Sequence, residues 1–451
     1  MMPKTPFTKR KHYAICFLMN KETLKYIIRN FHEKGIPFLY ERRVKLPLNT
    51  KKVIAVIGIR RSGKTFLLFQ TIKELIANNV PMHRIIYINF EDDRLFPVKL
   101  QGMDHILNAY YELYPENITV PKYIFLDEIQ HIKNWEKYVR RIFDTENINI
   151  YITGSSSELI THKLSTALQG RVIHYEVFPL SFQEILQIKE IQIQPYVTSA
   201  EAKMSNALTD YISWGGFPEV VLENDNTIRT KILKEYADLI FYKDLVEQFS
   251  LKNKYLLKYL LKHMITNPAA LCSINKLFQT LKSQGLALSK NSLYEYLEYL
   301  RQVYILFLTE KYSKSLRIKQ QNPSKYYIVD TGLMQIFGIE KHHNIGSKLE
   351  NIIYLHLRTC ENIKEIFYYQ NKYETDFYYY TDNKSYFVNV SDTVHSIETA
   401  ARETRSLMNV QKQYPEAKSL LVMSEWTNEL IPDNIEAISA LKFLTANPAH
   451  F

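Results

Sequence analysis

The eight residues "GIRRSGKT" (58–65) carry the most specific pattern in this chain of 451 residues. They match the phosphate-binding loop pattern G-x-x-x-x-G-K-[ST] at every fixed position. Because the chain contains 12 glycines in total, a chance match is rare, on the order of one per cent or less. The fixed positions are Gly58, Gly63, Lys64 and Thr65.

The sequence on either side of this loop predicts the surroundings that a phosphate site requires. Residues 53–57, "VIAVI", are apolar throughout, which predicts a strand buried on both faces. Residues 66–79 place apolar side chains at helical spacing. A strand, a glycine turn and a helix N-terminus direct several backbone N–H groups and the positive end of the helix dipole to one point, which binds phosphates.

The loop therefore predicts an ATP site that works with Mg²⁺. Lys64 is expected to contact the β- and γ-phosphates, and the hydroxyl of Thr65 is expected to bind Mg²⁺. The alternative is a tight turn that carries these residue types by chance. The residues predicted to contact ATP are Gly58, Arg60, Arg61, Ser62, Gly63, Lys64 and Thr65.

A second strand, in "KYIFLDEIQ" (122–130), ends in two acids. Asp127 is expected to hold the water shell of Mg²⁺, and Glu128 to orient or deprotonate the attacking water as a catalytic residue. Two adjacent acids at a strand end also occur on plain solvated surfaces. The phosphate loop upstream favours the catalytic interpretation.

Two more apolar runs, residues 84–92 and 148–157, predict further strands of the same sheet. The second run ends in "GSSS", so Ser155 or its neighbour Ser156 is a candidate contact for the γ-phosphate; a simple loop cap is the alternative. Strands that alternate with helices predict an α/β fold. Its parallel sheet has helices on both faces, and ligands bind at the carboxyl edge.

Composition indicates a globular protein of two or three domains, at 53.4 kDa and 46% hydrophobic residues. Cys16, Cys272 and Cys360 lie far apart, which predicts free thiols in a reducing compartment. The apolar run 14–19 is too short for a membrane helix, so we expect a cytoplasmic protein without a membrane partner. Residues 1–18 are expected to be a disordered or mis-assigned leader.

The net charge of +10 is concentrated in two segments. Residues 1–64 carry a surplus of 13 positive charges and residues 251–325 a surplus of 10, on a body that is otherwise acidic. Such segments suggest a polyanionic partner, although a charge run is more often a solvated face.

The second basic segment also has the element order of a winged helix. Its hydrophobic spacing predicts helices over 255–268, 273–285 and 289–302, followed by strands over 304–312 and 325–330. In a winged helix the third helix enters a DNA groove and the wing touches the backbone. Glu295 and Glu298 on the third helix oppose tight insertion, so the partner is either duplex DNA or a protein. A basic loop, residues 313–324, is expected to join the two strands. The predicted phosphate contacts are Lys311, Lys314, Arg317 and Lys319.

The order of these motifs resembles a known family. "GIRRSGKT", "YIFLDEIQHIKNWEKYVRRI", "IYITGSSSELI", "LQGRVIHYEVFPLSFQEIL" and "GGFPE" look like the AAA-type P-loop ATPases of bacteria and archaea, which carry a winged-helix segment and a C-terminal domain related to restriction nucleases. The resemblance makes Arg171 a candidate arginine finger, which acts in trans within a homo-oligomer. The expected divisions are a basic segment (1–50), the ATPase core (51–190), a helical lid or linker (191–250), the winged helix (251–340) and the nuclease-like domain (341–451).

From Gly346 the sequence predicts a helix, three strands, a helix and a strand. This order resembles the restriction-nuclease fold, and the resemblance also predicts that the domain is degenerate. Such a domain needs a helix glutamate, a strand aspartate and an E-x-K pair on the next strand to hold Mg²⁺ and activate water. Glu350 and Asp376 occupy the first two places, but Asn389 and Ser391 stand where the glutamate and lysine belong. Substitutes at shifted positions could come from Asp392 or Lys384.

The expected function is a Mg²⁺-dependent ATPase that couples slow hydrolysis to a DNA-linked or protein-interaction role. Two alternatives remain from the sequence. One is a nucleotide-controlled binding switch that holds ATP without hydrolysing it. The other is an ATP-dependent nuclease whose active site has migrated.

Overall fold

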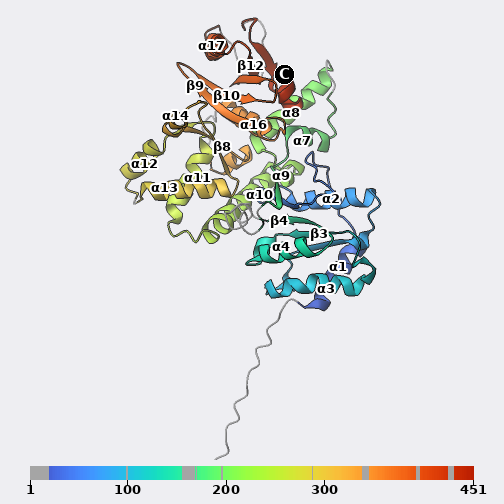
Figure 1. Cartoon of the computed structure of the whole chain (residues 1–451). Helices are drawn as coiled ribbons and strands as arrows, with labels where there is room; N and C mark the ends of the chain where they lie inside the picture. Colours follow the sequence, from blue (N-terminus) through green and yellow to red (C-terminus); the bar gives the residue numbers. More distant parts are fainter. Residues whose placement is uncertain are drawn as a thin grey trace, which may run out of the picture.

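The computed structural model describes residues 20–97, 100–154, 168, 170–193, 197–286, 288–337, 345–392, 397–424 and 431–451. The proposed leader, residues 1–18, and Ser155 lie outside these ranges. Figure 1 shows the N-terminal sheet at one end of the molecule and the C-terminal sheet at the other, with a helical region between them. Among the described residues, none of the helices is long and apolar enough to cross a membrane. Cys272 and Cys360 are free thiols, as predicted.

The N-terminal sheet has five parallel strands in the order β2-β3-β4-β1-β5. Its central strands are buried on both faces, which explains the unbroken apolar runs in the sequence. The strands are β1 (Val53–Ile57), β2 (Ile85–Asn89), β3 (Lys122–Asp127), β4 (Ile148–Thr153) and β5 (Val172–Glu176).

Helices cover both faces of this sheet, which makes it the parallel sheet of a P-loop NTPase, as predicted. Helix α2 (Lys64–Ala77) packs on one face, where Ile54 and Val56 of β1 point. Val53, Ala55 and Ile57 point to the other face, which three more helices cover. These are α1 (Lys21–Lys34), α3 (Asp104–Leu113) and α4 (Trp135–Thr145).

A mainly helical region follows the sheet. Its helices are α7 (Phe182–Ile188), α8 (Thr198–Trp214), α9 (Pro218–Leu222), α10 (Asn226–Leu239), α11 (Lys254–Thr266), α12 (Ile274–Ser283), α13 (Lys290–Gln302) and α15 (Met334–Phe337). Helix α10 continues directly into a π-helix, η6 (Ile240–Glu247). π-Helical turns are rare in proteins, and those that occur often lie at functional sites.

The three helices predicted for the second basic segment are confirmed as α11, α12 and α13. They pack with a small antiparallel sheet of order β6-β8-β7, formed by β6 (Leu271–Cys272), β7 (Leu306–Thr309) and β8 (Ser324–Ile328). The expectation of an irregular basic loop between β7 and β8 was wrong in part. Residues after Ser315 form a short helix, α14 (Leu316–Gln321).

The C-terminal sheet has the order β13-β12-β11-β10-β9. Strands β9, β10 and β11 are antiparallel, whereas β11, β12 and β13 are parallel. Helices α16 (Ile345–Arg358) and α17 (Ile397–Gln413) pack in different core clusters of this sheet. The predicted order of helix, three strands, helix and strand is confirmed, and a fifth strand and helix α18 (Ala440–Thr445) extend it. The strands are β9 (Glu365–Gln370), β10 (Glu374–Tyr380), β11 (Ser385–Ser391), β12 (Lys418–Met423) and β13 (Glu436–Ser439).

Candidate nucleotide-binding site

The loop between β1 and α2 can close tightly because glycine stands at two of its positive-φ positions. Gly58 has φ +147°, and a Cβ there would lie 2.1 Å from the carbonyl oxygen of Val177. Gly63 has φ +96° and caps the N-terminus of α2. Both conformations favour glycine, so the backbone requires the two glycines that the sequence pattern fixes.

The side chain of Lys64 folds back over this loop. Its Nζ donates hydrogen bonds to the carbonyl oxygens of Gly58 at 3.0 Å and Ile59 at 3.1 Å. Burial lowers the pKa of Lys64, because the ammonium loses its water. The N–H groups of the first turn of α2 have no partner within the helix, and the hydroxyl of Ser62 is buried without a hydrogen bond. This concave, donor-rich loop can accept phosphate oxygens.

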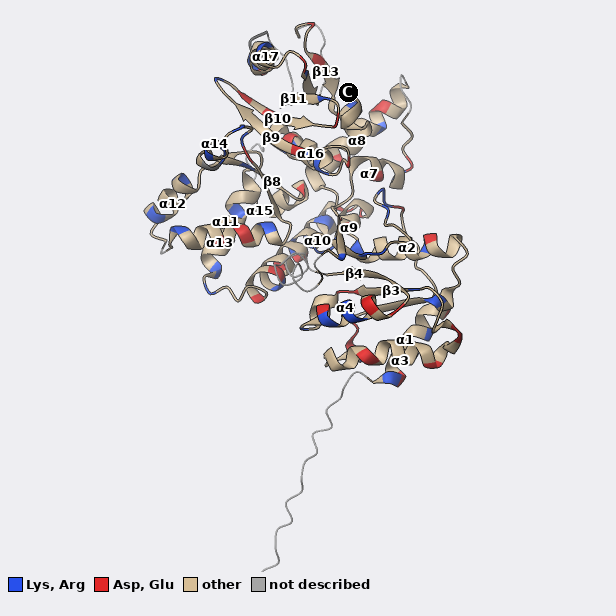
Figure 2. Ribbon diagram, in the orientation of Figure 1, with Lys and Arg blue, Asp and Glu red and all other residues tan. Residues whose placement is uncertain are grey.

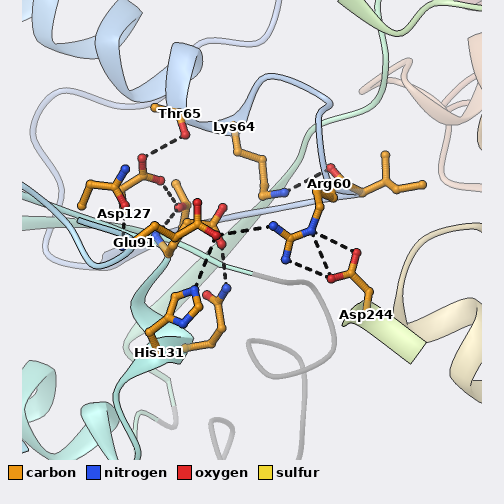
Figure 3. Close-up of polar contacts among 12 residues, drawn as sticks. Arg60, Lys64, Thr65, Glu91, Asp127, His131 and Asp244 are labelled. Atoms are coloured by element: carbon orange, nitrogen blue, oxygen red, sulfur yellow. Dashed lines mark hydrogen bonds and ion pairs between the residues drawn. The ribbon is translucent and has the colours of Figure 1, made fainter. Parts of the chain in front are cut away.

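Asp127 lies beside the loop at the carboxyl end of β3 and is fully buried. Its Oδ2 accepts hydrogen bonds from the hydroxyls of Thr65 at 2.9 Å and Tyr87 at 2.8 Å, and its Oδ1 accepts one from Thr153 (Figure 3). Burial raises the pKa of Asp127. These partners are neutral hydroxyls, so they orient the carboxylate without neutralising it, and a cation would be strongly favoured here.

Glu128 is held in a left-handed conformation, with φ +53°. Its N–H donates to the hydroxyl of Thr153 at 3.0 Å, and its carboxylate accepts from Gln130 Nε2 at 2.6 Å. A non-glycine residue at positive φ is uncommon and often marks a functional position. The carboxylates of Glu91 and Glu128 and the ring of His131 offer atoms within 4.8 Å of one another.

The first of the two arginines in the loop contacts a distant part of the chain. The guanidinium of Arg60 binds the carboxylate of Asp244 on η6, with Nη2–Oδ1 at 3.0 Å and Nε–Oδ1 at 3.2 Å (Figure 3). A longer contact of 3.5 Å joins Arg60 to Glu91. The neighbouring Arg61 lies 5.6 Å from the centre of the Tyr236 ring on α10. Both arginines therefore link the loop to the helical region.

Most of the predicted site residues meet at this edge of the sheet, but Arg171 does not. It precedes β5, whose register with β1 pairs Val172 with Val53. That is the amino edge of the sheet, opposite the loop, where Arg171 forms an ion pair with Asp144 at 3.2 Å. Arg171 therefore cannot serve the loop of its own chain.

Sequence reasoning missed three contributors to the site: Tyr87, Thr153 and Asp244. Thr153 is the last residue of β4 and lies two residues before the candidate Ser155. The same strand end in the sequence could therefore have identified its hydroxyl. Tyr87 and Asp244 carry no local signal, because each reaches the site only through packing of separate elements.

Comparisons with known proteins agree with this geometry. The sequence profile of an AAA domain matches residues 50–186, and that of a domain of unknown function (DUF8612) matches residues 205–342. The protein MJ1544 of Methanocaldococcus jannaschii is 37% identical over 348 residues, which span 76% of this chain and 75% of that protein. The chain belongs to the MJ1544 family.

The chain is also similar to a bacterial protein. A Haemophilus influenzae protein is 27% identical over 397 residues, which span 88% of this chain and 95% of its own length. A solved structure of the Aeropyrum pernix ORC2 protein (ADPNP-ADP complexes) is 12% identical, covers 71% of this chain and 94% of its own, and has a TM-score of 0.28. A score this low carries no conclusion about the present chain.

In this member of the MJ1544 family, the C-terminal sheet brings Glu350 of α16 and Asp376 of β10 together. Neither proposed substitute stands there. Lys384 is exposed in the turn at the far end of the β10–β11 hairpin, and Asp392 accepts a hydrogen bond from Ser424 at 2.7 Å. The side-chain amide of Asn389 donates to Glu403 O and Ser406 Oγ, each at 2.8 Å, and so faces α17.

Proposed function

We propose that the chain is a Mg²⁺-dependent ATPase that binds ATP at residues 58–65 and hydrolyses it slowly. The observation that carries this proposal is the contact between Thr65 and Asp127, which lies beside the buried ammonium of Lys64. It places a hydroxyl, a carboxylate and a lysine of a P-loop NTPase around one point.

Each residue has a role that follows from its chemistry. The backbone N–H groups from Ser62 to Thr65 and the Lys64 ammonium would bind the phosphates. Thr65 and Asp127 would hold Mg²⁺, which supplies positive charge to the reacting phosphate when it is bound. Glu128 would orient the attacking water and accept its proton.

A signal from this site has a direct route to the rest of the chain through Arg60 and Asp244. Asp244 lies close enough to Lys64 and Glu128 to interact electrostatically with both. A triphosphate in the loop would repel the Asp244 carboxylate and compete for Arg60. We infer that ATP loosens this contact and shifts η6, which is followed after six residues by α11.

Arg171 fits the same proposal as an arginine finger only in a homo-oligomer. It is about one third exposed on its own chain, at the edge strand β5, so a neighbouring subunit could receive it. This role would make hydrolysis depend on protein concentration, because the finger acts in trans.

The basic region between β7 and β8 supports a DNA-linked role in the same function. Lys314 and Arg317 are exposed, and basic residues also lie along α12 and α13 (Figure 2). The Nζ of Lys319 instead lies 4.5 Å from the ring centre of Phe367. This cation–π contact makes the ammonium less available to a phosphate. Exposed Leu316 and Ile318 on α14 favour the alternative, a protein partner, because apolar side chains gain little from a phosphate backbone.

The decisive experiment on hydrolysis is Glu128→Gln. The variant should bind ATP with unchanged affinity yet turn it over at least roughly a hundredfold more slowly, the usual scale for losing a base or water-positioning group. Glu136→Gln on α4 is the matched control and should behave as wild type. Equal turnover in Glu128→Gln and wild type would refute the hydrolase and leave a switch that holds ATP without hydrolysing it.

The DNA-linked role is tested by the salt dependence of binding to duplex DNA. Four phosphate contacts give a log–log slope of about −3.6, at about −0.9 for each contact. Alanine at Lys311, Lys314, Arg317 and Lys319 should flatten the slope by up to that amount, and the exposed pair Lys314 and Arg317 should account for about half. Lys137→Ala on α4 is the control. An unchanged slope would move the contact to the basic residues before Thr65, and no binding at low salt would indicate a protein partner.

A further inference from the structure

The most unusual polar group outside the ATP site is the ammonium of Lys325. This residue lies on β8 of the small sheet and is 2% exposed. Three carboxylate oxygens surround its Nζ, from Glu350 at 2.9 Å, Asp376 at 2.9 Å and Glu374 at 2.7 Å. A lysine is almost never fully buried unless it is paired, and this one has three acidic partners.

The three carboxylates belong to another layer of the molecule. Glu350 comes from α16, whereas Glu374 and Asp376 start β10 of the C-terminal sheet. The lysine therefore joins the small β6-β8-β7 sheet to the C-terminal sheet by an ionic contact. Its ammonium has three N–H donors, and each has its own carboxylate oxygen.

Other hydrogen bonds hold these carboxylates in place. The hydroxyl of Tyr327 donates to Glu350 Oε1 at 2.8 Å, and the N–H of Val390 donates to Asp376 Oδ2 at 2.9 Å. The N–H of Asp376 itself donates to Asn389 Oδ1 at 3.2 Å. Glu350 and Asp376 are thus held in place by their own hydrogen bonds, and not only by attraction to the lysine.

The charges in this cluster favour a cation at its centre. Burial by itself lowers the pKa of Lys325, but the carboxylates of Asp376, Glu350 and Glu374 raise it well above the usual value, so the amine stays charged. Oxygens from three carboxylates are also the ligands that a hard divalent cation takes in proteins. The ammonium and a divalent cation cannot both use the same oxygens, because they would repel each other at contact distance.

We propose that the Lys325 ammonium takes the place of a divalent cation in the Glu350–Glu374–Asp376 cluster and ties the small sheet to the C-terminal sheet. The residues present therefore do not fit the Mg²⁺ site that an active nuclease domain of this type needs, which agrees with the predicted degeneracy of the domain. The cation that neutralises the carboxylates is part of the chain. Removing it exposes a latent site for a divalent cation. This inference is independent of the proposed ATPase function.

The test is binding of Mn²⁺ to Lys325→Met, measured by titration of the paramagnetic signal of free Mn²⁺ without nucleotide. Lys325→Met should bind one more Mn²⁺ than wild type, with an affinity in the range of weak oxygen-ligand sites. Lys325→Arg is the matched control, since it keeps the positive charge and should gain no ion. The double variant Lys325→Met, Asp376→Asn should lose the added ion.

Thermal stability gives a second measurement that does not depend on a measurable affinity. Mg²⁺ or Mn²⁺ should raise the melting temperature of Lys325→Met by more than that of wild type or Lys325→Arg, which keep only the Asp127 site, because a cation that binds the folded state stabilises it. If Lys325→Met does not fold alone, it should fold with a divalent cation present. A variant that stays unfolded or unstabilised with the cation overturns the proposal. The proposal is also overturned if wild-type protein binds an ion that the Asp376→Asn variant does not bind.

Discussion

The two ends of the molecule each hold a carboxylate beside a buried lysine, and they use the pair in opposite ways. Asp127 at the N-terminal sheet is surrounded by the hydroxyls of Thr65, Tyr87 and Thr153, while Lys64 points to backbone carbonyls. Asp376 at the C-terminal sheet is bound directly by the ammonium of Lys325. The neutral hydroxyls leave the charge of Asp127 available to a ligand, whereas the Lys325 ammonium compensates the charge of Asp376 within the protein.

The difference shows that residue types alone do not identify a metal site. A carboxylate oriented by neutral donors keeps a net negative field, which costs stability in the empty protein and attracts a cation. A carboxylate paired with a buried ammonium contributes to the structure and attracts less. The nature of the closest partner, rather than the presence of acids, separates the two regions.

The largest expected effect distinguishes the two lysines. Lys64→Ala should abolish ATP binding, or weaken it at least about a hundredfold, because the phosphates lose a charge-assisted contact in a site with little water. Lys325→Met should leave ATP affinity unchanged. Titration of a fluorescent ATP analogue measures both, with Lys73→Ala, exposed on α2, as the control. Equal losses in both lysine variants would mean that the two sites are not independent.

The two aspartates should differ in the sign of their effect on stability. Asp376→Asn removes one partner of a buried ammonium and should lower the free energy of unfolding by about 1–3 kcal/mol, the smaller part of the range for buried pairs because Glu350 and Glu374 remain. Asp127→Asn removes a buried charge that forms no ion pair with any described residue, and should raise stability without nucleotide by about 0.5–2 kcal/mol while preventing Mg²⁺-dependent turnover.

Thermal and urea unfolding without nucleotide measure both variants. A loss of stability in Asp127→Asn as large as that in Asp376→Asn would contradict the comparison. It would mean that the hydroxyl contacts of Asp127 are structural and that its charge is already balanced in the empty protein.

The sequence was sufficient to bring together the phosphate loop and the two acids of the N-terminal site because their signals are local. The pattern of residues 58–65 and the acids after β3 each lie within a few residues of the element that positions them, and parallel strands bring the two together at one edge. The order of helices and strands in the C-terminal half was predicted for the same reason, since each element has its own hydrophobic period.

The remaining features depend on contacts between distant parts of the chain. Lys325 lies 25 residues from Glu350 and 51 from Asp376, and was predicted only as the start of a strand. Asp244 lies 184 residues from Arg60. Strand β13, with four residues, is too short to show a clear alternation. The spacing of residues along the sequence does not show which distant acids will form ion pairs with a buried lysine.

A smaller effect is expected where the nucleotide site contacts the helical region. Asp244→Asn removes a negative charge near the predicted phosphates and releases Arg60, so ATP affinity should rise by about fivefold, which corresponds to about 1 kcal/mol for one partly screened charge. Asp238→Asn, exposed on α10, is the control. Weaker ATP binding in Asp244→Asn would show that the contact holds the loop in its binding conformation rather than competing with phosphate.

The smallest expected effect concerns DNA cleavage, because we expect the C-terminal domain not to cleave DNA at all. Linear and supercoiled plasmid should stay intact with wild-type protein, ATP and either Mg²⁺ or Mn²⁺, because Lys325 occupies the carboxylates and Asn389 and Ser391 replace the groups that would complete the site. Lys325→Met should also fail to cut, even where it binds Mn²⁺, since serine cannot act as the missing lysine. Cleavage by wild-type protein that disappears in Asp376→Ala would reverse the comparison. Lys325 would then be a migrated catalytic lysine, and the two ends of the molecule would both be active sites.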